Sequence, residues 1–300
     1  MMRERHLYLL GHPVGHSKSA VMYNAVYEAA GLPWRYELLD CPTEADARAV
    51  LDGRAFLQVN ITTPYKPLAF EVADERTEAV ERIGGANVLV NDDGRLVAHN
   101  TDGIGCVGFL KREGFAFEGA RVAICGTGPT ALAILTACAE ADTGEILLLG
   151  RDAVRAQAVF DDWLARGSQA GAADPQGAAR RVSASSYGKA AERIAQADLV
   201  VNATPLGMNA GDPAPFEGSL LHAGQWAFDC VYGHGETAFA RAAREAGCVV
   251  YDGAGMLVGQ AVATVRIVAR TVGAEVAIDD DDGMFEIMAD AAGFALSHAG

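Results

Sequence analysis

Short apolar runs alternate with amphipathic stretches in the N-terminal part of the chain. The apolar runs at residues 6–10, 34–39 and 56–61 predict strands, and the stretches at residues 20–30 and 43–51 predict helices. Because strands that alternate with helices form βαβ units, this pattern predicts a mostly parallel α/β sheet.

The same part of the chain ends in a different pattern. Residues 75–83 predict a charged helix, and the apolar residues on both sides of Asp92-Asp93-Gly94 predict a β-hairpin that turns there. A helix at residues 104–113 then leads into the second half of the chain. We therefore place the first domain boundary near residue 104.

The segment at residues 121–139 has the pattern of a strand, a glycine turn and a helix. Gly126, Gly128 and Ala131 match the G-x-G-x-x-G/A spacing, in which the first glycine makes the turn and the second lets a diphosphate approach the backbone. Pro129 fits the first helical position, where its missing N–H costs nothing. The N–H groups that begin this helix could bind a diphosphate.

A second strand at residues 145–149 completes a βαβ unit, which favours nucleotide binding over a purely structural glycine turn. A carboxylate at the end of this strand binds the ribose 2′-hydroxyl of NAD, whereas an arginine there accommodates the 2′-phosphate of NADP. Arg151, with Arg155 one helical turn later, favours NADP, and Asp152 favours NAD. The segment therefore predicts a Rossmann-type, doubly wound dinucleotide-binding domain with NADP as its cofactor.

The rest of the chain continues the alternation of strands and helices. Residues 167–179, which are rich in Ala, Gly, Ser and Gln, are expected to form a mobile surface loop, and residues 279–282 a solvated acidic loop rather than a cation site. The further predicted elements are helices at 153–166, 189–196, 236–246, 256–272 and 284–297, and strands at 182–185, 198–202, 226–231 and 248–251.

Polar side chains follow several of the predicted strands. They are hydroxyls, amides, a lysine and a carboxylate, the groups that a polyhydroxylated substrate and a proton transfer require. Ser17 and Ser19 could instead cap the following helix, Asn87 could be a turn residue, and Lys66 and Asp102 could form a structural ion pair. The joint position of Lys66 and Asp102 at strand ends favours the functional interpretation. The candidates are Ser17, Ser19, Asn60, Thr62, Lys66, Asn87 and Asp102.

Composition excludes several classes of protein. The chain has 24 Lys and Arg against 39 Asp and Glu, a net charge of −15 without a basic cluster, so we expect no nucleic-acid or membrane partner. The apolar run at residues 7–10 is too short for a signal sequence, and no later segment is expected to approach a membrane span. The six cysteines include no C-x-x-C pair and predict a reduced, cytoplasmic protein. His12 and His16 lack a nearby further ligand in the sequence, so no metal is expected.

Ordered motifs along nearly the whole chain resemble those of the shikimate dehydrogenase family. Three residues depart from the family pattern along the expected substrate wall, namely Ala20, Tyr23 and Val88. The matching motifs lie at residues 11–19 (G-x-P-x-x-H-S-x-S), 60–66 (N-x-T-x-P-x-K), 83–87, 100–103 (N-T-D-G), 202–208 (N-A-T-P-L-G-M) and 252–261 (D-G-x-x-M-L-x-x-Q-A).

The resemblance implies a reversible, NADP-linked reduction of 3-dehydroshikimate to shikimate, with Lys66 and Asp102 as the proton-transfer pair. It also implies a substrate-binding and catalytic domain of residues 1–104 plus 253–300, to which the C-terminal helices return, and an NADP-binding Rossmann domain of residues 105–252, with the substrate between domains that open and close. The substrate-binding residues would be Ser17, Ser19, Asn60, Thr62, Asn87, Tyr232 and Gln260. The cofactor-binding residues would be Gly126, Thr127, Gly128, Pro129, Thr130, Ala131, Arg151, Arg155, Thr204 and Gly253.

Two other functions stay open at this point. The first is a quinate/shikimate dehydrogenase that uses NAD, because sequence alone does not measure the room near Ser17 and Ser19 for the tertiary hydroxyl of quinate. The second is a non-catalytic, nucleotide-sensing protein with the same fold, which would be expected to lose Lys66 or Asp102, although both are present. We expect a monomer or a homodimer that binds a small hydroxy acid.

Overall fold

The chain divides into two compact units. The computed structural model describes residues 5–170, 177, 180–278 and 280–295. The first unit comprises Met1–Gly105 and Val258–Gly300, and the second comprises Cys106–Leu257. The predicted boundary between residues 252 and 253 lies five residues before the boundary between Leu257 and Val258 in the structure. The ligand assigned to each domain stays a prediction.

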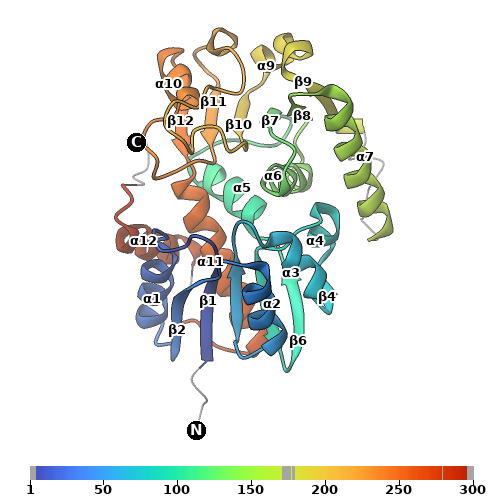
Figure 1. Cartoon of the computed structure of the whole chain (residues 1–300). Helices are drawn as coiled ribbons and strands as arrows, with labels where there is room; N and C mark the ends of the chain where they lie inside the picture. The colour runs from blue at the N-terminus through green and yellow to red at the C-terminus, as the bar shows by residue number, and fades with distance from the viewer. Residues whose placement is uncertain (1–4, 171–176, 178–179, 279, 296–300) are drawn as a thin grey trace. The chain divides into compact units, whose positions relative to one another are not determined.

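The first unit contains a six-stranded sheet in the order β2-β1-β3-β5-β6-β4 (Figure 1). Only β5 runs antiparallel to its neighbours, so the prediction of a mostly parallel sheet is confirmed. Its strands are β1 (Arg5–Gly11), β2 (Trp34–Asp40), β3 (Gln58–Ile61), β4 (Glu75–Arg76), β5 (Val88–Asp92) and β6 (Arg95–His99).

The helices of the first unit include the C-terminal one, which packs against α1, so the expected return of the C-terminal helices to this unit is confirmed. Two further helices, α5 (Asp102–Arg112) and α11 (Ala254–Val272), run from one unit into the other. The helices within the unit are α1 (Ser19–Ala29), α2 (Glu44–Gly53), α3 (Lys66–Val72), α4 (Glu78–Ile83) and α12 (Asp281–Ala292).

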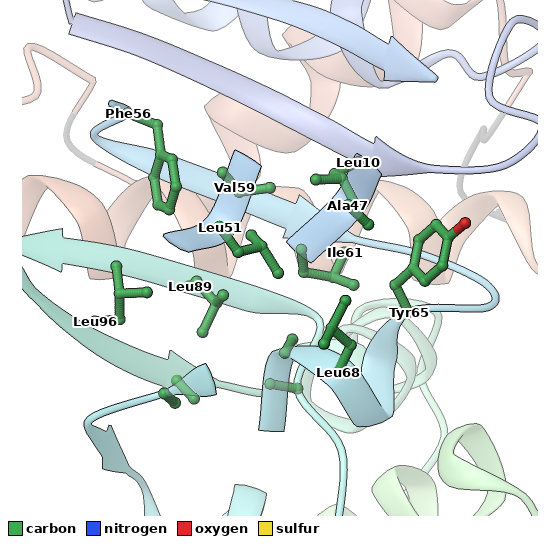
Figure 2. Packing of buried hydrophobic residues seen from close by; sticks show 14 of the residues in the cluster. Leu10, Ala47, Leu51, Phe56, Val59, Ile61, Tyr65, Leu68, Leu89 and Leu96 are labelled. Atoms are coloured by element: carbon green, nitrogen blue, oxygen red, sulfur yellow. The ribbon is translucent and has the colours of Figure 1, made fainter. Parts of the chain in front are cut away.

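One hydrophobic cluster joins the sheet of the first unit to α2, α3 and α4 (Figure 2). Leu51 from α2 and Leu68 from α3 meet Val59, Ile61 and Leu89 from the strands. Leu51 and Val59 are fully buried, and burying an aliphatic side chain of this size contributes about 1.5–3 kcal/mol. This packing holds the N-terminus of α3, and with it Lys66, at the carboxyl end of β3.

The second unit is an all-parallel, doubly wound sheet in the order β12-β11-β10-β7-β8-β9, which confirms the predicted Rossmann-type fold. The strand order reverses between β7 and β10, where such sheets bind ligands. The strands are β7 (Arg121–Cys125), β8 (Glu145–Gly150), β9 (Val182–Ser186), β10 (Leu199–Asn202), β11 (Trp226–Asp229) and β12 (Val249–Asp252). The helices are α6 (Pro129–Glu140), α7 (Ala153–Gln169), α9 (Ala191–Gln196) and α10 (Ala238–Glu245), with 3₁₀ turns η1 (Tyr187–Lys189) and η2 (Gly218–Leu220).

The prediction of one helix over residues 75–83 is wrong. Glu75 and Arg76 form β4 and pair with β6, and the helix begins only at Glu78. Just before β4, the Asp74 carboxylate accepts hydrogen bonds from the Leu96 backbone N–H (2.8 Å) and from Arg54. Tertiary pairing therefore overrides the helical preference of this charged segment.

Two predicted loops are partly helical. Residues 167–169 belong to α7, whose Trp163 is fully buried and donates from its indole N–H to Thr136 Oγ1 at 2.9 Å. Of the rest of that predicted loop, residues 171–176 and 178–179 lie outside the described residues.

In the predicted acidic loop, Asp280 caps α12 by accepting from the Gly283 N–H, and Asp281 and Asp282 form its first turn. Carboxylates are favourable there because the N-terminus of a helix carries a partial positive charge. Asp279 is not among the described residues.

The long helix α11 corrects another expectation. By length and composition it is apolar enough to cross a membrane, although no segment was expected to approach that limit. Within its apolar stretch 56% is buried inside the protein. The apolar residues of α11 therefore serve to a large extent as protein core.

Candidate functional site

The candidate residues fall into two groups, one in each unit. The first unit carries the serines, Lys66 and Asp102, the amides of the strand ends and Gln260. The second carries the glycine turn, the arginines, Thr204, Tyr232 and Gly253.

Lys66 and Asp102 form an ion pair in the first unit. Lys66 is the first residue of α3, and Asp102 is the first residue of α5, which begins two residues before the predicted position. The two side chains are only 16% and 11% exposed. The Lys66 amine therefore contacts a carboxylate at the N-terminus of α5, where a negative charge is favourable.

Asn87 fixes the other oxygen of this carboxylate. Its Nδ2 donates to Asp102 Oδ1 at 2.8 Å and to Thr101 Oγ1 at 3.0 Å, and its Oδ1 accepts from the Thr101 backbone N–H at 2.8 Å. Asn87 itself is 3% exposed. The alternative that Asn87 is only a turn residue therefore does not describe it fully, because its amide orients Asp102.

Asn60 lies beneath Asn87 and supports it. Its Oδ1 accepts from the Tyr36 hydroxyl and from Gln58 Nε2, both at 2.8 Å, and its Nδ2 donates to the Asn87 backbone carbonyl at 3.5 Å. The residue is 4% exposed. These bonds engage both ends of the Asn60 amide, so a direct contact with substrate stays a prediction.

The two serines form a local pair at the start of α1. Ser17 Oγ donates to Ser19 Oγ at 3.1 Å and accepts from the Ser19 backbone N–H at 3.2 Å. Neither is the N-cap residue, because Lys18 takes that position and makes no side-chain cap bond, but Ser17 still satisfies the first N–H of α1. The loop with these serines lies beside the loop of Thr62, since the His12 N–H donates to the Thr63 carbonyl at 3.2 Å.

Gln260 belongs to a buried polar cluster that the sequence did not reveal. Thr101 Oγ1 donates to Gln260 Oε1 at 3.4 Å and lies 3.4 Å from Thr264 Oγ1. Tyr23 faces this cluster, and burial raises the pKa of its hydroxyl, partly offset by the side chains of Thr264, Asn60 and Gln260. The only sequence signal for Thr101 was its place beside Asp102 in the N-T-D-G motif.

His12 has a carboxylate neighbour that was missed. Its Nδ1 lies 3.0 Å from Asp40 Oδ1, although Asp40 is 28 residues away in the chain. Across the described ranges, no group of three His, Cys, Asp or Glu side chains is placed to hold a metal ion.

In the second unit the two glycines of the turn have different steric roles. Gly126 has φ of +120°, and a Cβ there would stand 2.7 Å from the Ala203 carbonyl oxygen, so this position requires glycine. Gly128 has φ of −88°, and a Cβ there would meet no protein atom within 4 Å. The protein itself therefore does not require glycine at 128, whereas a closely approaching ligand would.

The N-terminus of α6 suits a diphosphate group. Gly128 occupies the N-cap position without a side-chain cap bond, and Pro129 follows as the first helical residue, as predicted. The backbone N–H groups of the first turn of α6 are therefore available as donors to a ligand. Ala131 is fully buried, which allows α6 to pack closely, and Thr127 and Thr130 are half-buried in the same turn.

Asp152 does not compete with the arginines for the role of cofactor ligand. It is the N-cap residue of α7, and its carboxylate accepts from the Arg155 backbone N–H at 2.8 Å. Arg151 and Arg155 are exposed, and within the part of the chain that is described neither guanidinium forms a salt bridge. The residue that favoured NAD thus serves as a helix cap, and two cations remain near the end of β8.

Three further candidates lie near the ends of β10, β11 and β12. Thr204 is held by Asn202, whose Oδ1 accepts from the Thr204 N–H at 3.1 Å and from its hydroxyl at 2.6 Å. Burial raises the pKa of Tyr232, so its hydroxyl stays protonated at neutral pH. A Cβ at Gly253 would stand 2.3 Å from the Cys230 carbonyl oxygen, so glycine is needed there for packing, and its contact with a cofactor stays a prediction.

The chain is similar to known proteins over most of its length. The model of the shikimate dehydrogenase substrate binding domain matches residues 9–89. The shikimate dehydrogenase (NADP(+)) of Moorella thermoacetica is 36% identical over 264 residues, 86% of each protein. The quinate/shikimate dehydrogenase of Escherichia coli is 32% identical over 84% of this chain and 88% of its own length. The crystal structure of shikimate 5-dehydrogenase from Thermus thermophilus, in complex with NADP(H) and shikimate, has a TM-score of 0.78 and 29% identity, and covers 96% of this chain and 99% of the other.

The different roles of the two glycines predict different results for alanine substitution. We expect Gly126→Ala to lower the melting temperature, because the Cβ meets the Ala203 carbonyl and the φ of +120° is unfavourable for alanine. We expect Gly128→Ala to keep the wild-type melting temperature but to weaken NADP binding about tenfold or more, because a Cβ would stand where the diphosphate approaches. Thermal unfolding and calorimetric titration with NADP measure the two effects. Wild-type NADP affinity in Gly128→Ala would refute this placement of the diphosphate.

Proposed function

The chain belongs to the shikimate dehydrogenase family, and we propose that it catalyses the reversible, NADP-linked reduction of 3-dehydroshikimate to shikimate. One observation carries the catalytic part of the proposal: the ion pair of Lys66 and Asp102, held in place by Asn87. The family relationship and the Rossmann-type second unit support the use of a nicotinamide dinucleotide.

Reduction of the ketone adds a hydride to the carbonyl carbon and a proton to the oxygen. The nicotinamide dinucleotide, when bound, would supply the hydride for reduction and accept it in oxidation. Lys66 donates the proton to the ketone oxygen during reduction and takes it from the hydroxyl during oxidation. Asp102 keeps the Lys66 amine in position, and Asn87 prevents the carboxylate from rotating.

The substrate hydroxyls and carboxylate are bound by side chains that carry donors. The paired hydroxyls of Ser17 and Ser19 lie at the start of α1, and the protonated hydroxyl of Tyr232 can donate to a carboxylate. Asn60 contributes by supporting Asn87. The proposed substrate-binding residues are Ser17, Ser19, Asn60, Thr62, Asn87, Tyr232 and Gln260.

The second unit binds NADP in this proposal, and the first unit carries all the proposed substrate-binding residues except Tyr232. Arg151 and Arg155 bind the 2′-phosphate, because a guanidinium matches the geometry of a phosphate and no neighbouring carboxylate in the described part of the chain neutralises either one. The proposed cofactor-binding residues are Gly126, Thr127, Gly128, Pro129, Thr130, Ala131, Arg151, Arg155, Thr204 and Gly253.

We further propose a cytoplasmic protein that is a monomer or a homodimer. All six cysteines lie in described segments and all are free thiols, four of them buried. This fits a reducing compartment, where buried thiols serve as small apolar residues. The net charge of −15 makes binding to nucleic acid or to anionic membranes unfavourable.

The function is tested by the formation of reduced nicotinamide when purified protein is offered shikimate or quinate with NADP or NAD. We expect turnover with shikimate and NADP, and kcat/KM at least tenfold lower for the other three combinations. A preference for quinate or for NAD would establish the alternative function. Absence of turnover in every combination would contradict the proposal and support a non-catalytic role.

Lys66→Met removes the proton donor and keeps much of the length of the side chain. We expect kcat to fall by about 10²–10⁴, the usual contribution of a positioned acid or base. NADP affinity is expected to stay within about twofold, because Lys66 lies in the first unit and the proposed cofactor residues lie in the second. Lys111→Met, at an exposed lysine of α5, is the matched control. Retained turnover in Lys66→Met would eliminate its catalytic role.

Arg151→Ala tests the assignment of the 2′-phosphate. Hydrogen bonds between charged groups are worth about 1.5–3 kcal/mol, so we expect NADP affinity to fall about 10- to 100-fold while NAD affinity changes little. Titration of both cofactors measures the difference, and Arg166→Ala, in the last turn of α7, the helix that follows Arg151, is the control. Equal losses of affinity for NADP and NAD would contradict the assignment of the 2′-phosphate to Arg151.

A further inference from the structure

Asp229 is a buried carboxylate that accepts hydrogen bonds from several turns of the second unit. It is the last residue of β11 and is 1% exposed. Its Oδ1 accepts from Asn202 Nδ2 at 3.0 Å and from the Val231 backbone N–H at 3.1 Å, and its Oδ2 accepts from Thr237 Oγ1 at 2.5 Å. A carboxylate taken out of water is costly unless such donors replace the lost hydration.

Each of these donors belongs to a different segment near the carboxyl edge of the sheet. Asn202 ends β10, Val231 precedes the candidate residue Tyr232, and Thr237 caps α10 by accepting from the Ala240 N–H at 3.0 Å. One side chain therefore links the connections that follow two neighbouring strands. These connections carry Thr204 and Tyr232.

Asn202 connects Asp229 to the turn that contains Thr204, because its side chain is hydrogen-bonded to both. Its Nδ2 also donates to the Leu206 carbonyl at 3.1 Å, and its Oδ1 accepts from both the N–H and the hydroxyl of Thr204. Thr204 Oγ1 in turn accepts from the Leu206 N–H at 3.2 Å. Every polar atom of the Asn202 side chain is thus engaged in shaping this turn.

In the described part of the chain no cation pairs with Asp229. Among the described residues, no lysine, arginine or histidine forms a salt bridge with it. Burial raises the pKa of Asp229, and its hydrogen bonds with Thr237, Val231 and Asn202 lower it in part. The carboxylate therefore acts as a hydrogen-bond acceptor for neutral donors and not as one half of an ion pair.

We propose that Asp229 is a positioning residue that holds the Thr204 turn and the Tyr232 turn in the arrangement needed to bind cofactor and substrate. The inference rests on the proposed function for the roles of Thr204 and Tyr232. In this proposal Asp229 acts through these neighbours, because it is 1% exposed and its carboxylate accepts from Asn202, Val231 and Thr237.

Two substitutions separate hydrogen-bond acceptance from bulk. Asp229→Leu has a similar size but no hydrogen-bond acceptor. The Val231 amide then loses its acceptor, and the Thr204 amide loses the restraint that Asp229 exerts through Asn202. Asp229→Asn keeps one oxygen that accepts from Asn202 and Val231, while its amide can donate to Thr237 Oγ1. Asp198→Asn is the control, because Asp198 precedes β10 at the opposite end of the sheet and accepts from the Arg121 N–H at 2.8 Å and from its guanidinium.

The first measurement is backbone hydrogen exchange of the protein without cofactor. In Asp229→Leu we expect the amides of Thr204, Leu206 and Val231 to exchange at least tenfold faster, with wild-type exchange in β7 and β8. Asp229→Asn should restore most of this protection. Asp198→Asn should accelerate exchange at Arg121 and leave the two turns unchanged. Unchanged exchange in the turns of Asp229→Leu would overturn the proposal.

The second measurement is NADP affinity by calorimetry. Leaving a buried donor unsatisfied costs about 1–3 kcal/mol, so we expect NADP to bind Asp229→Leu about 5- to 150-fold more weakly and Asp229→Asn within about threefold of the wild type. Wild-type affinity in Asp229→Leu would refute the positioning role. If Asp229→Leu does not fold, Thr237→Val removes one donor, and local loss of protection with weaker NADP binding is expected there too. Unchanged values in Thr237→Val would then refute the inference.

These measurements fail independently of the proposed function. The wild type could convert none of the substrates while the Thr204 and Tyr232 turns lose protection in Asp229→Leu. The proposed reaction would then be wrong, and Asp229 would position these turns for nucleotide binding alone. If the wild type is active and Asp229→Leu shows wild-type exchange and affinity, the proposed function stands and the inference is wrong.

Discussion

The hydrogen bond from Asn87 to Asp102 is the interaction on which the proposed chemistry depends. It fixes one oxygen of the carboxylate at 2.8 Å, so the other oxygen can face Lys66. Asn87 is in turn held from below, because Asn60 donates to its carbonyl and Tyr36 and Gln58 donate to Asn60. A lysine on a flexible stem becomes a directed proton donor only when its partner cannot rotate, and these buried amides supply that restraint.

The second unit uses the same physical device at the carboxyl edge of its own sheet. There a buried asparagine, Asn202, is bonded to a buried aspartate, Asp229, and the pair shapes the turn that carries Thr204. In both units an amide lies between a carboxylate and a backbone turn, since an amide can donate and accept at once. The difference is that Asp102 has a cationic partner, whereas Asp229 has neutral donors among the described residues.

Local features of the fold and the site followed from sequence because they depend on neighbouring residues. Apolar periodicity located most strands and helices, and the spacing of Gly126 and Gly128 identified the turn before α6. Sequence was less reliable where a segment or a residue is compatible with two different local structures or roles. Residues 75–83 have helical composition, yet β6 pairs with the first of them, and Asp152 has the character of a ribose ligand, yet it caps α7.

The sequence by itself determined the fold class, the family and the residue types of the proposed catalytic pair, because patterns of period two and 3.6 and short motifs are contiguous in the chain. Tertiary structure alone decided which polar groups meet. Asn87 and Asp102 are 15 residues apart, Asn202 and Asp229 are 27 apart, and His12 and Asp40 are 28 apart. Their contacts depend on the order in which strands adjoin in each sheet, and hydrogen bonds reach only about 3 Å, so no periodicity in the sequence records them.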